Sequence, residues 1–315
     1  MVIMAKKTSR RVGEAGENPR RPCPCGSGKR YKVCHGAGED VIVTRPFAGL
    51  AAECDLVAMR EFLPSATALL PLAEPLDVPV TLATVLPGAC AALVRANGEI
   101  MLGMQVQARS GDLSADLGRA LAWARTAEPG SSLTLAPQAA VSGAVRLQDQ
   151  LDLEAVLEPT VHADFGWWLF PNEDGSPPSA EVIAMLERAN AMIMPTEPVL
   201  AEGVRAAYWV DTGSKAHLRW VRPEPEDALL TALARLQARG ELALSGQARY
   251  AGSFRAHGLL VPVWDLDREP HAKEWAVPVA RMAAALTAAL AEPTPLTDVE
   301  RRARDALAGK QVTLR

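Results

Sequence analysis

Four residues near the N-terminus have the types and spacing of a metal site. Cys23 and Cys25 are separated by eight residues from the adjacent pair Cys34 and His35. Structural zinc sites use four tetrahedral ligands, and three Cys with one His is a common set. In an extended segment, residues two apart point to the same side, so the first two sulfurs can reach one ion. The sequence therefore predicts that these four residues bind Zn²⁺.

The residues around the four ligands suit a tight metal-binding turn. Pro22 and Pro24 restrict the backbone and keep the first segment extended. Gly26 and Gly28 permit the positive φ of a turn. A segment this short has almost no apolar core. Its folding free energy must therefore come from metal binding, which supplies about 10–16 kcal/mol. Three nearby cations offset the negative charge of a zinc ion held by three thiolates: Lys29, Arg30 and Lys32.

Two other kinds of chemistry fit this segment less well. A Cys-x-Cys pair can form a disulfide, but the adjacent Cys-His pair favours a metal. The run 25–30 also resembles part of a P-loop, which needs a Gly five residues before its Gly-Lys pair and a Ser or Thr after it. Those positions hold Cys23 and Arg30, and no apolar strand precedes them. We therefore predict that no nucleotide binds here.

The 15 residues 22–36, PCPCGSGKRYKVCHG, resemble the SEC-C motif. This motif is the small zinc domain in the C-terminal tail of SecA, the preprotein translocase ATPase, and occurs in many otherwise unrelated bacterial proteins. The resemblance implies that Cys23, Cys25, Cys34 and His35 are zinc ligands. In the translocase the domain docks the export chaperone SecB and has been linked to ribosome and lipid contacts. It therefore implies a docking role rather than catalysis.

The resemblance to the translocase does not extend to the rest of the chain. The motif stands near the N-terminus here, and the remaining residues have neither the length nor the Walker A loop of that motor. The whole layout is similar to an uncharacterised actinobacterial family: a basic arm, an N-terminal SEC-C motif and an Ala-rich body. That second resemblance implies a domain of unknown function and supplies no activity.

Charge is distributed unevenly along the 315 residues. Residues 1–35 contain nine Lys or Arg and two Glu, whereas the whole chain has a net charge of −4. A basic arm on an acidic body suggests that the arm has its own partner, for which the ribosome or RNA is an alternative to protein. No run of 18 apolar residues and no secretory signal pattern occurs, so we expect no membrane span and a cytoplasmic location.

The chain divides by composition into an arm, the motif and a body. Residues 1–21 lack hydrophobic periodicity and are predicted to be a disordered basic arm, followed by the zinc knuckle at 22–36. The body is predicted to span 41–315. The loop NEDGSPPS at 172–179 suggests two subdomains, with a boundary near 172–200.

The body repeats one order of elements, a strand, a turn, a strand and a helix. The first unit is expected at 91–96, 100–108 and 113–127, the second at 204–210, 216–221 and 226–239, and the third at 249–256, 259–264 and 274–290. Such units make antiparallel sheet with helices on one face, so the predicted fold class is α+β. Further helices are expected over 179–191 and 297–308.

The body contains few candidates for catalysis. His162 and Asp164 are two residues apart and could share a strand face, but we favour a structural turn followed by an aromatic strand that packs into the core. Cys54 and Cys90 are more typical of small buried residues than of nucleophiles. No catalytic or cofactor-binding residue is therefore assigned in the body, and no Ser-hydrolase, zinc-protease or dinucleotide motif is present.

These features favour a zinc-binding accessory protein of bacterial origin. The knuckle would dock a protein partner, or else the ribosome or RNA through the basic arm, and the body would supply a second surface. The alternative is an enzyme with its active site in the body and the knuckle as a recruitment tag. Under that alternative, His162 and Asp164 are the first residues to test.

Overall fold

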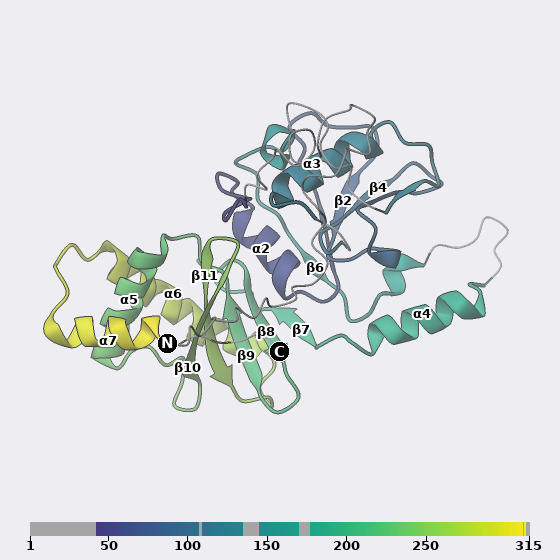
Figure 1. Ribbon diagram of the computed structural model, residues 1–315. Helices are drawn as coiled ribbons and strands as arrows, with labels where there is room; N and C mark the ends of the chain where they lie inside the picture. The colour runs from purple at the N-terminus through teal and green to yellow at the C-terminus, as the bar shows by residue number, and fades with distance from the viewer. Residues whose placement is uncertain (1–41, 107–108, 135–144, 170–176, 311, 313–315) are drawn as a thin grey trace, which may run out of the picture. The chain divides into compact units, whose positions relative to one another are not determined.

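The computed structural model describes residues 42–106, 109–134, 145–169, 177–310 and 312 (Figure 1). By their contacts, Val43–Arg315 belong to one unit, and Met1–Ile42 to another. The predicted zinc ligands Cys23, Cys25, Cys34 and His35 lie outside the described residues. The description below therefore concerns the body.

The described residues contain both helices and sheets, and the predicted α+β class is confirmed. Six α-helices, α2 to α7, accompany a six-stranded and a five-stranded sheet in this part of the chain (Figure 1). Short 3₁₀ helices connect some of these elements: η1 (Pro87–Ala89), η2 (Leu147–Asp149), η3 (Gly166–Trp168) and η4 (Ala272–Trp275). None of the helices in the described residues is long and apolar enough to cross a lipid bilayer.

The five-stranded sheet is antiparallel throughout, with strand order β10-β11-β9-β8-β7. Its strands are β7 (Thr196–Pro198), β8 (Ala207–Asp211), β9 (Ala216–Trp220), β10 (Arg249–Ala256) and β11 (Leu259–Leu266). His257 and Gly258 form the β10–β11 turn, and both have positive φ. We call this sheet the second sheet.

One face of the second sheet packs on helices α5 (Glu226–Arg239) and α6 (Ala276–Ala291). Trp220 and Trp264 project from the sheet into this core, where they meet Leu233 and Leu286 of the helices. Helix α7 (Asp298–Ala308) covers α5. The layer is one sheet with helices on one face, as the repeated units predict.

Local signals define the ends of these helices. Gly240 stops α5 in the left-handed conformation, which favours glycine because it lacks a Cβ. Thr297 and Glu300 form a capping box at the start of α7, in which each side chain accepts a bond from the backbone of the other. These are the residues at which the sequence pattern predicts the helix ends.

The six-stranded sheet has the order β5-β3-β4-β2-β1-β6 and is mixed. Its strands are β1 (Ala66–Leu69), β2 (Val80–Ala83), β3 (Ala92–Val94), β4 (Ile100–Gly103), β5 (Ser132–Leu133) and β6 (Thr160–Val161). The β2–β4 pair is parallel, whereas the other pairs are antiparallel. We call this sheet the first sheet.

One face of the first sheet is buried beneath helices α2 (Glu53–Glu61) and α3 (Leu113–Ala124). Leu82 and Leu102 of the sheet share a core cluster with Leu56 of α2 and Leu121 of α3. Asp112 caps α3 by accepting bonds from two backbone amides of its first turn. The other face of this sheet carries the polar residues considered below.

Helix α2 packs against both sheets. Its core cluster includes apolar residues of the second sheet, and the Phe62 ring lies edge-on to the rings of Tyr208 and Phe254. Polar pairs surround this packing: Arg45 with Glu53 at 2.7 Å, Arg205 with Asp55 at 2.9 Å, and His257 with Glu61 at 2.8 Å. A single apolar cluster therefore joins α2, the first sheet and one face of the second.

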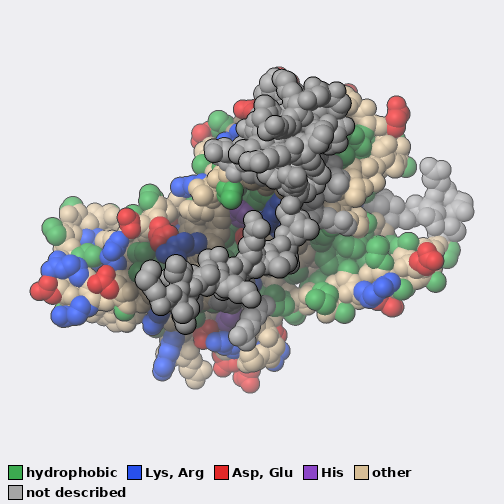
Figure 2. Space-filling view, viewed as in Figure 1, with side chains coloured by type: hydrophobic (Ala, Val, Ile, Leu, Met, Phe, Trp, Pro, Cys, Tyr) green, Lys and Arg blue, Asp and Glu red, His purple; other side chains and the backbone are tan. Residues whose placement is uncertain are grey.

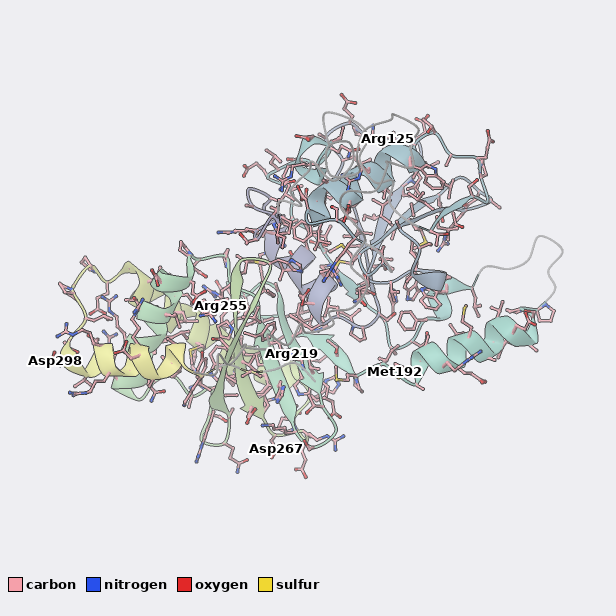
Figure 3. All side chains as sticks on the ribbon, in the orientation of Figure 1. Arg125, Met192, Arg219, Arg255, Asp267 and Asp298 are labelled. Carbon is pink, nitrogen blue, oxygen red and sulfur yellow. The ribbon has the colours of Figure 1, made fainter. Side chains whose placement is uncertain are left out.

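Helix α4 (Ala180–Asn190) differs from the other helices because none of its residues is buried. Figure 2 shows hydrophobic side chains along it. Ile183 is 42% exposed, and Met192, just beyond the helix, is 82% exposed (Figure 3). The predicted helix over 179–191 is thus present, and its apolar side chains remain accessible.

Candidate functional site

The described residues that converge on one candidate site lie on the open face of the first sheet. Thr81 of β2 is paired with Met101 of β4, and Leu69 of β1 is paired with Thr81. Paired residues share a face, and so do residues two apart on one strand, which places Thr67 beside them. The side chains of Thr67, Thr81 and Met101 form the floor of an open pocket of about 220 Å³.

The walls of this pocket come from two loops. Arg95 and Glu99 flank the turn between β3 and β4, where Gly98 has positive φ. Trp167 of η3 forms the opposite wall. Among the described residues, the lining combines four polar side chains with an indole and a thioether: Thr67, Thr81, Arg95, Glu99, Met101 and Trp167.

Trp167 is held in place by the segment that contains His162 and Asp164. The indole nitrogen donates to Ser65 Oγ at 2.8 Å, and that hydroxyl donates to the backbone oxygen of Asp164 at 2.8 Å. The His162 ring lies 5.7 Å from the Trp167 ring, centroid to centroid. Trp168 Nε1 donates to the backbone oxygen of Val85 at 3.1 Å. The indole of Trp167 is therefore fixed by bonds at its edge and by packing.

His162 contacts the pocket lining, whereas the carboxylate of Asp164 has another partner. His162 Nε2 and Thr67 Oγ1 are joined by a hydrogen bond of 2.8 Å. Asp164 Oδ1 accepts from the backbone nitrogen of Gly166 at 2.7 Å, which closes a turn. Burial lowers the pKa of His162, although the charge of Asp164 partly opposes this. Because the carboxylate stabilises the turn, the two residues do not form an acid–base pair in this conformation.

The segment that follows His162 is a turn, as predicted, but not a strand. Gly166–Trp168 is the 3₁₀ helix η3, and the two Trp residues are only partly buried. Phe165 stacks on Trp168, with ring centroids 4.3 Å apart, and is itself buried. The aromatic run therefore covers part of the open face of the first sheet instead of joining a sheet.

The charged residues of the pocket nearly cancel. Arg95 Nη1 lies 3.5 Å from Glu99 Oε2, and Arg95 Nε and Nη2 donate to Met101 Sδ at 3.1 and 2.8 Å. Burial lowers the pKa of Arg95, with the charge of Glu99 opposing that shift. A thioether sulfur is a weak acceptor. The site thus combines one cation and one anion with hydroxyls and a fixed aromatic surface.

Neither cysteine of the described body suits nucleophilic chemistry. Cys54 and Cys90 are buried, as expected, and neither forms a disulfide. Burial raises the pKa of Cys54 to about 12, and burial also raises that of Cys90. Both thiols are therefore protonated near neutral pH, and a thiol is a much weaker nucleophile than a thiolate.

Trp209 of β8 and Trp220 of β9 are both buried. They do not form a cross-strand pair, because Trp209 lies opposite Leu218 and Trp220 opposite Ala207. His217 is partly buried, with Nε2 3.3 Å from Asp265 Oδ1. No cluster of three or more potential metal ligands occurs among the described residues.

Comparison with known families assigns two regions of the chain. The model of the SEC-C motif matches residues 22–37, in agreement with the resemblance seen in the sequence. A second model, described as a family of unknown function (DUF5926), matches residues 46–315, which is most of the chain. The chain belongs to the DUF5926 family. No curated protein and no solved structure matches it.

The DUF5926 domain contains both sheets and therefore the pocket. Most of the pocket lining was not anticipated from the sequence, because strands β1 and β2 were not predicted. A signal existed for Arg95 and Glu99, since they flank the turn predicted between the strands at 91–96 and 100–108 and so face each other across a hairpin. The position of Thr67 and Thr81 beside that hairpin depends on the parallel β2–β4 pairing.

Proposed function

We propose that this member of the DUF5926 family is a zinc-binding interaction protein whose SEC-C motif docks a protein partner. The observation that carries the proposal is the match to the SEC-C motif over residues 22–37, which contains Cys23, Cys25, Cys34 and His35. These residues supply a complete tetrahedral donor set of three thiolates and one imidazole. When bound, zinc supplies the folding free energy of the motif.

The donor set predicts one Zn²⁺ per chain. We expect Cys34→Ser to weaken zinc binding by at least about tenfold, because a hydroxyl is a poorer zinc ligand than a thiolate. Cys90→Ala is the matched control, because Cys90 lies in the body. Zinc content after dialysis against a weak chelator measures the effect. Full retention of zinc in Cys34→Ser would contradict the proposed ligand set.

The docking role is tested separately from metal binding. Affinity capture from the native cytoplasm would compare the intact chain with a chain lacking residues 1–36, and with the Cys23→Ser, Cys25→Ser double variant. We expect a protein partner that is captured by the intact chain and lost from both variants. Identical partners for all three proteins would overturn the proposal.

The basic arm supports a ribosome or RNA partner as the other outcome of this test. Contacts between Lys or Arg and phosphate weaken steeply as salt rises, because bound counterions are released. Capture that is lost at moderate salt and after nuclease treatment would therefore assign the partner to nucleic acid. A partner that survives both treatments would be a protein. In either case we place the function in the cytoplasm.

We also propose the domain bounds that the sequence predicts. Residues 1–21 are an arm, 22–36 the knuckle and 41–315 the body, with an internal boundary near 172–200. Limited proteolysis tests this, with expected cleavage in the arm and within 172–179. Helix α4 follows that loop and keeps its apolar residues accessible, which supports a second interaction surface on the body.

The pocket on the first sheet favours a second candidate function, an enzyme that uses the motif as a recruitment tag. His162 contacts Thr67 of the pocket, but the Asp164 carboxylate accepts a bond from Gly166. His162 would then act without Asp164 as its base. His162→Ala measured beside Asp164→Asn separates these roles, because only the first should abolish an activity centred on the imidazole.

A further inference from the structure

The pocket on the open face of the first sheet has the size of one small ring. Its volume is about 220 Å³, whereas drug-sized ligands occupy pockets of about 300–1,000 Å³. Water takes up about 30 Å³ in the liquid, so the pocket equals roughly seven water molecules. A ligand that fills it would be a single ring with its substituents, and not a peptide or a dinucleotide.

The pocket presents an aromatic surface whose orientation is already fixed. Trp167 is anchored through its indole nitrogen to Ser65 and packed against the rings of His162 and Trp168. An indole face carries partial negative charge, so it attracts the polarised C–H groups of a flat, saturated ring. Because the ring is held before a ligand arrives, binding requires little ordering of the protein.

The floor and the far wall supply hydrogen-bonding groups. The hydroxyl of Thr81 has no hydrogen-bond partner among the described residues and lines the pocket. Glu99 can accept hydrogen bonds, and the guanidinium of Arg95 can donate them. A ligand with several hydroxyl groups could both donate and accept here. An apolar ring would cover the Thr81 hydroxyl without giving it a hydrogen-bond partner, at a cost of about 1–3 kcal/mol.

The charge of the lining argues against an ionic ligand. Arg95 and Glu99 carry opposite charges 3.5 Å apart. Burial holds the pKa of His162 below its ordinary value, so the imidazole adds no positive charge at neutral pH. An anion would be attracted by Arg95 and repelled by Glu99, whereas a cation would be attracted by Glu99 and repelled by Arg95. The pair of Arg95 and Glu99 therefore gives the pocket no net charge that would favour an ion of either sign.

We propose that this pocket binds a neutral monosaccharide or a polyol ring of similar size, which stacks on Trp167 and hydrogen-bonds to Thr81, Arg95 and Glu99. This proposal does not rest on the proposed zinc site, because the residues that it invokes all lie in the body. The expected affinity is weak, with a dissociation constant in the millimolar range, since the ligand is small and the pocket open.

Saturation-transfer NMR on the full chain tests the proposal. The probes are glucose, galactose, mannose, N-acetylglucosamine and myo-inositol, with glucose 6-phosphate and glucuronate as charged analogues. We expect signals from at least one neutral probe, and binding at least about tenfold weaker for its charged analogue. Binding should persist after zinc is removed by a chelator, which separates this result from failure of the zinc proposal.

Variants of the lining provide the second part of the test. Thr81→Val and Trp167→Ala should each weaken binding of the neutral probe by about tenfold, whereas Thr160→Val should not. Thr160 is an exposed threonine of β6 that is outside the pocket. Circular dichroism verifies folding, and Trp167→Phe replaces Trp167→Ala if the latter unfolds. Equal binding by Thr81→Val and Thr160→Val, tighter binding of a charged analogue, or no signal from any neutral probe would each overturn the proposal.

Discussion

The two sheets of the body differ in how their faces are used. The second sheet is buried on both faces, by α5 and α6 on one side and by the cluster around α2 on the other. The first sheet is fully buried on one face, whereas its other face is covered only in part, around Ala83 and Met101, and carries Thr67, Thr81 and the pocket. Strands β10 and β11 are eight residues long, whereas the strands of the first sheet have two to four.

This difference separates scaffold from site. A sheet buried on both faces gains stability from every side chain, but leaves no surface for a ligand. A sheet with one open face has less apolar burial and can present polar groups on a rigid frame. We therefore expect substitutions in the second sheet to act on stability, and substitutions on the open face of the first to act on binding.

The largest expected effect is the loss of Trp264 from the second sheet. This side chain is fully buried, its indole nitrogen donates to Leu242 O at 2.8 Å, and its ring packs against Trp220 and Tyr250. Trp264→Ala should lower the free energy of unfolding by about 3–5 kcal/mol, because it removes burial and leaves a cavity. Urea denaturation followed by circular dichroism measures this.

The matched substitution on the open face of the first sheet is Leu69→Ala. Leu69 is 67% exposed although it is the last residue of β1 and pairs with Thr81 of β2. Its truncation should change the free energy of unfolding by no more than about 0.5 kcal/mol. Similar losses for Trp264→Ala and Leu69→Ala would show that the two sheets do not differ as described.

Two buried arginines lie on opposite faces of the second sheet and are expected to contribute differently to stability. Arg235 of α5 donates to three backbone oxygens, those of Ala289, Glu292 and Thr294, at 2.5–2.9 Å. Arg235→Met should lower the free energy of unfolding by about 2–3 kcal/mol, because partly buried acceptors lose their donor. Urea denaturation measures this change in the free energy of unfolding.

Arg219 of β9 is the contrasting case (Figure 3). The residue is only 2% exposed, and its guanidinium lies 5.8 Å from the centroid of the Phe62 ring. It has no ion-pair partner among the described residues. Burial lowers its pKa to about 10, so carrying the charge at pH 7 costs the folded state free energy. Arg219→Met should leave stability unchanged or raise it by about 1–4 kcal/mol. A loss as large as that of Arg235→Met would contradict this.

The sequence predicts the second sheet better than the first for a physical reason. The β10–β11 hairpin and helix α5 follow from long apolar patterns with clear ends at His257-Gly258 and Gly240. Strands β1 and β2 read ATAL and VTLA, too short for a period to be recognised and rich in Ala, which has low strand propensity. Their place in the sheet depends on contacts with distant residues.

The candidate site follows the same rule. The turn that joins Arg95 to Glu99 is local, so a hairpin signal can find it. The hydrogen bond of His162 with Thr67 spans 95 residues, and Trp167 reaches Ser65 across 102 residues. Short motifs cannot reveal such pairs. The proposed zinc ligands are the opposite case, because all four lie within 13 residues of sequence.

A glycine beneath the first sheet gives the next largest effect. A Cβ added to Gly118 of α3 would lie 2.1 Å from the backbone oxygen of Val145. Alanine gains about 1 kcal/mol in helix propensity, but the backbone of a packed segment cannot retreat cheaply. Gly118→Ala should therefore lower the free energy of unfolding by about 1–3 kcal/mol.

Gly246→Ala, where a Cβ meets open space, is the control and should change the free energy of unfolding by no more than about 0.5 kcal/mol. Thermal denaturation of both variants decides the point, and equal melting temperatures would contradict the close approach.

The smallest effect concerns the pair that joins α2 to the β10–β11 turn. Glu61 and His257 form a hydrogen bond of 2.8 Å, and this bond is the main reason that the pKa of Glu61 lies below its ordinary value of 4.5. As pH falls through 4.5, Glu61 is protonated in the unfolded chain before it is protonated in the folded protein. The contribution of Glu61 to stability is therefore complete above its unfolded pKa and is lost as pH falls through the lower folded pKa.

Glu61→Gln should remove this contribution, which is about 1 kcal/mol for a partly exposed pair. The difference in free energy of unfolding between wild type and variant should be present at pH 6 and shrink towards zero in acid. Glu187→Gln, at an exposed carboxylate on α4, should show no such pH-dependent difference. Urea denaturation at a series of pH values measures both. A difference that stays constant into acid would mean that Glu61 stabilises α2 through packing and not through its pair with His257.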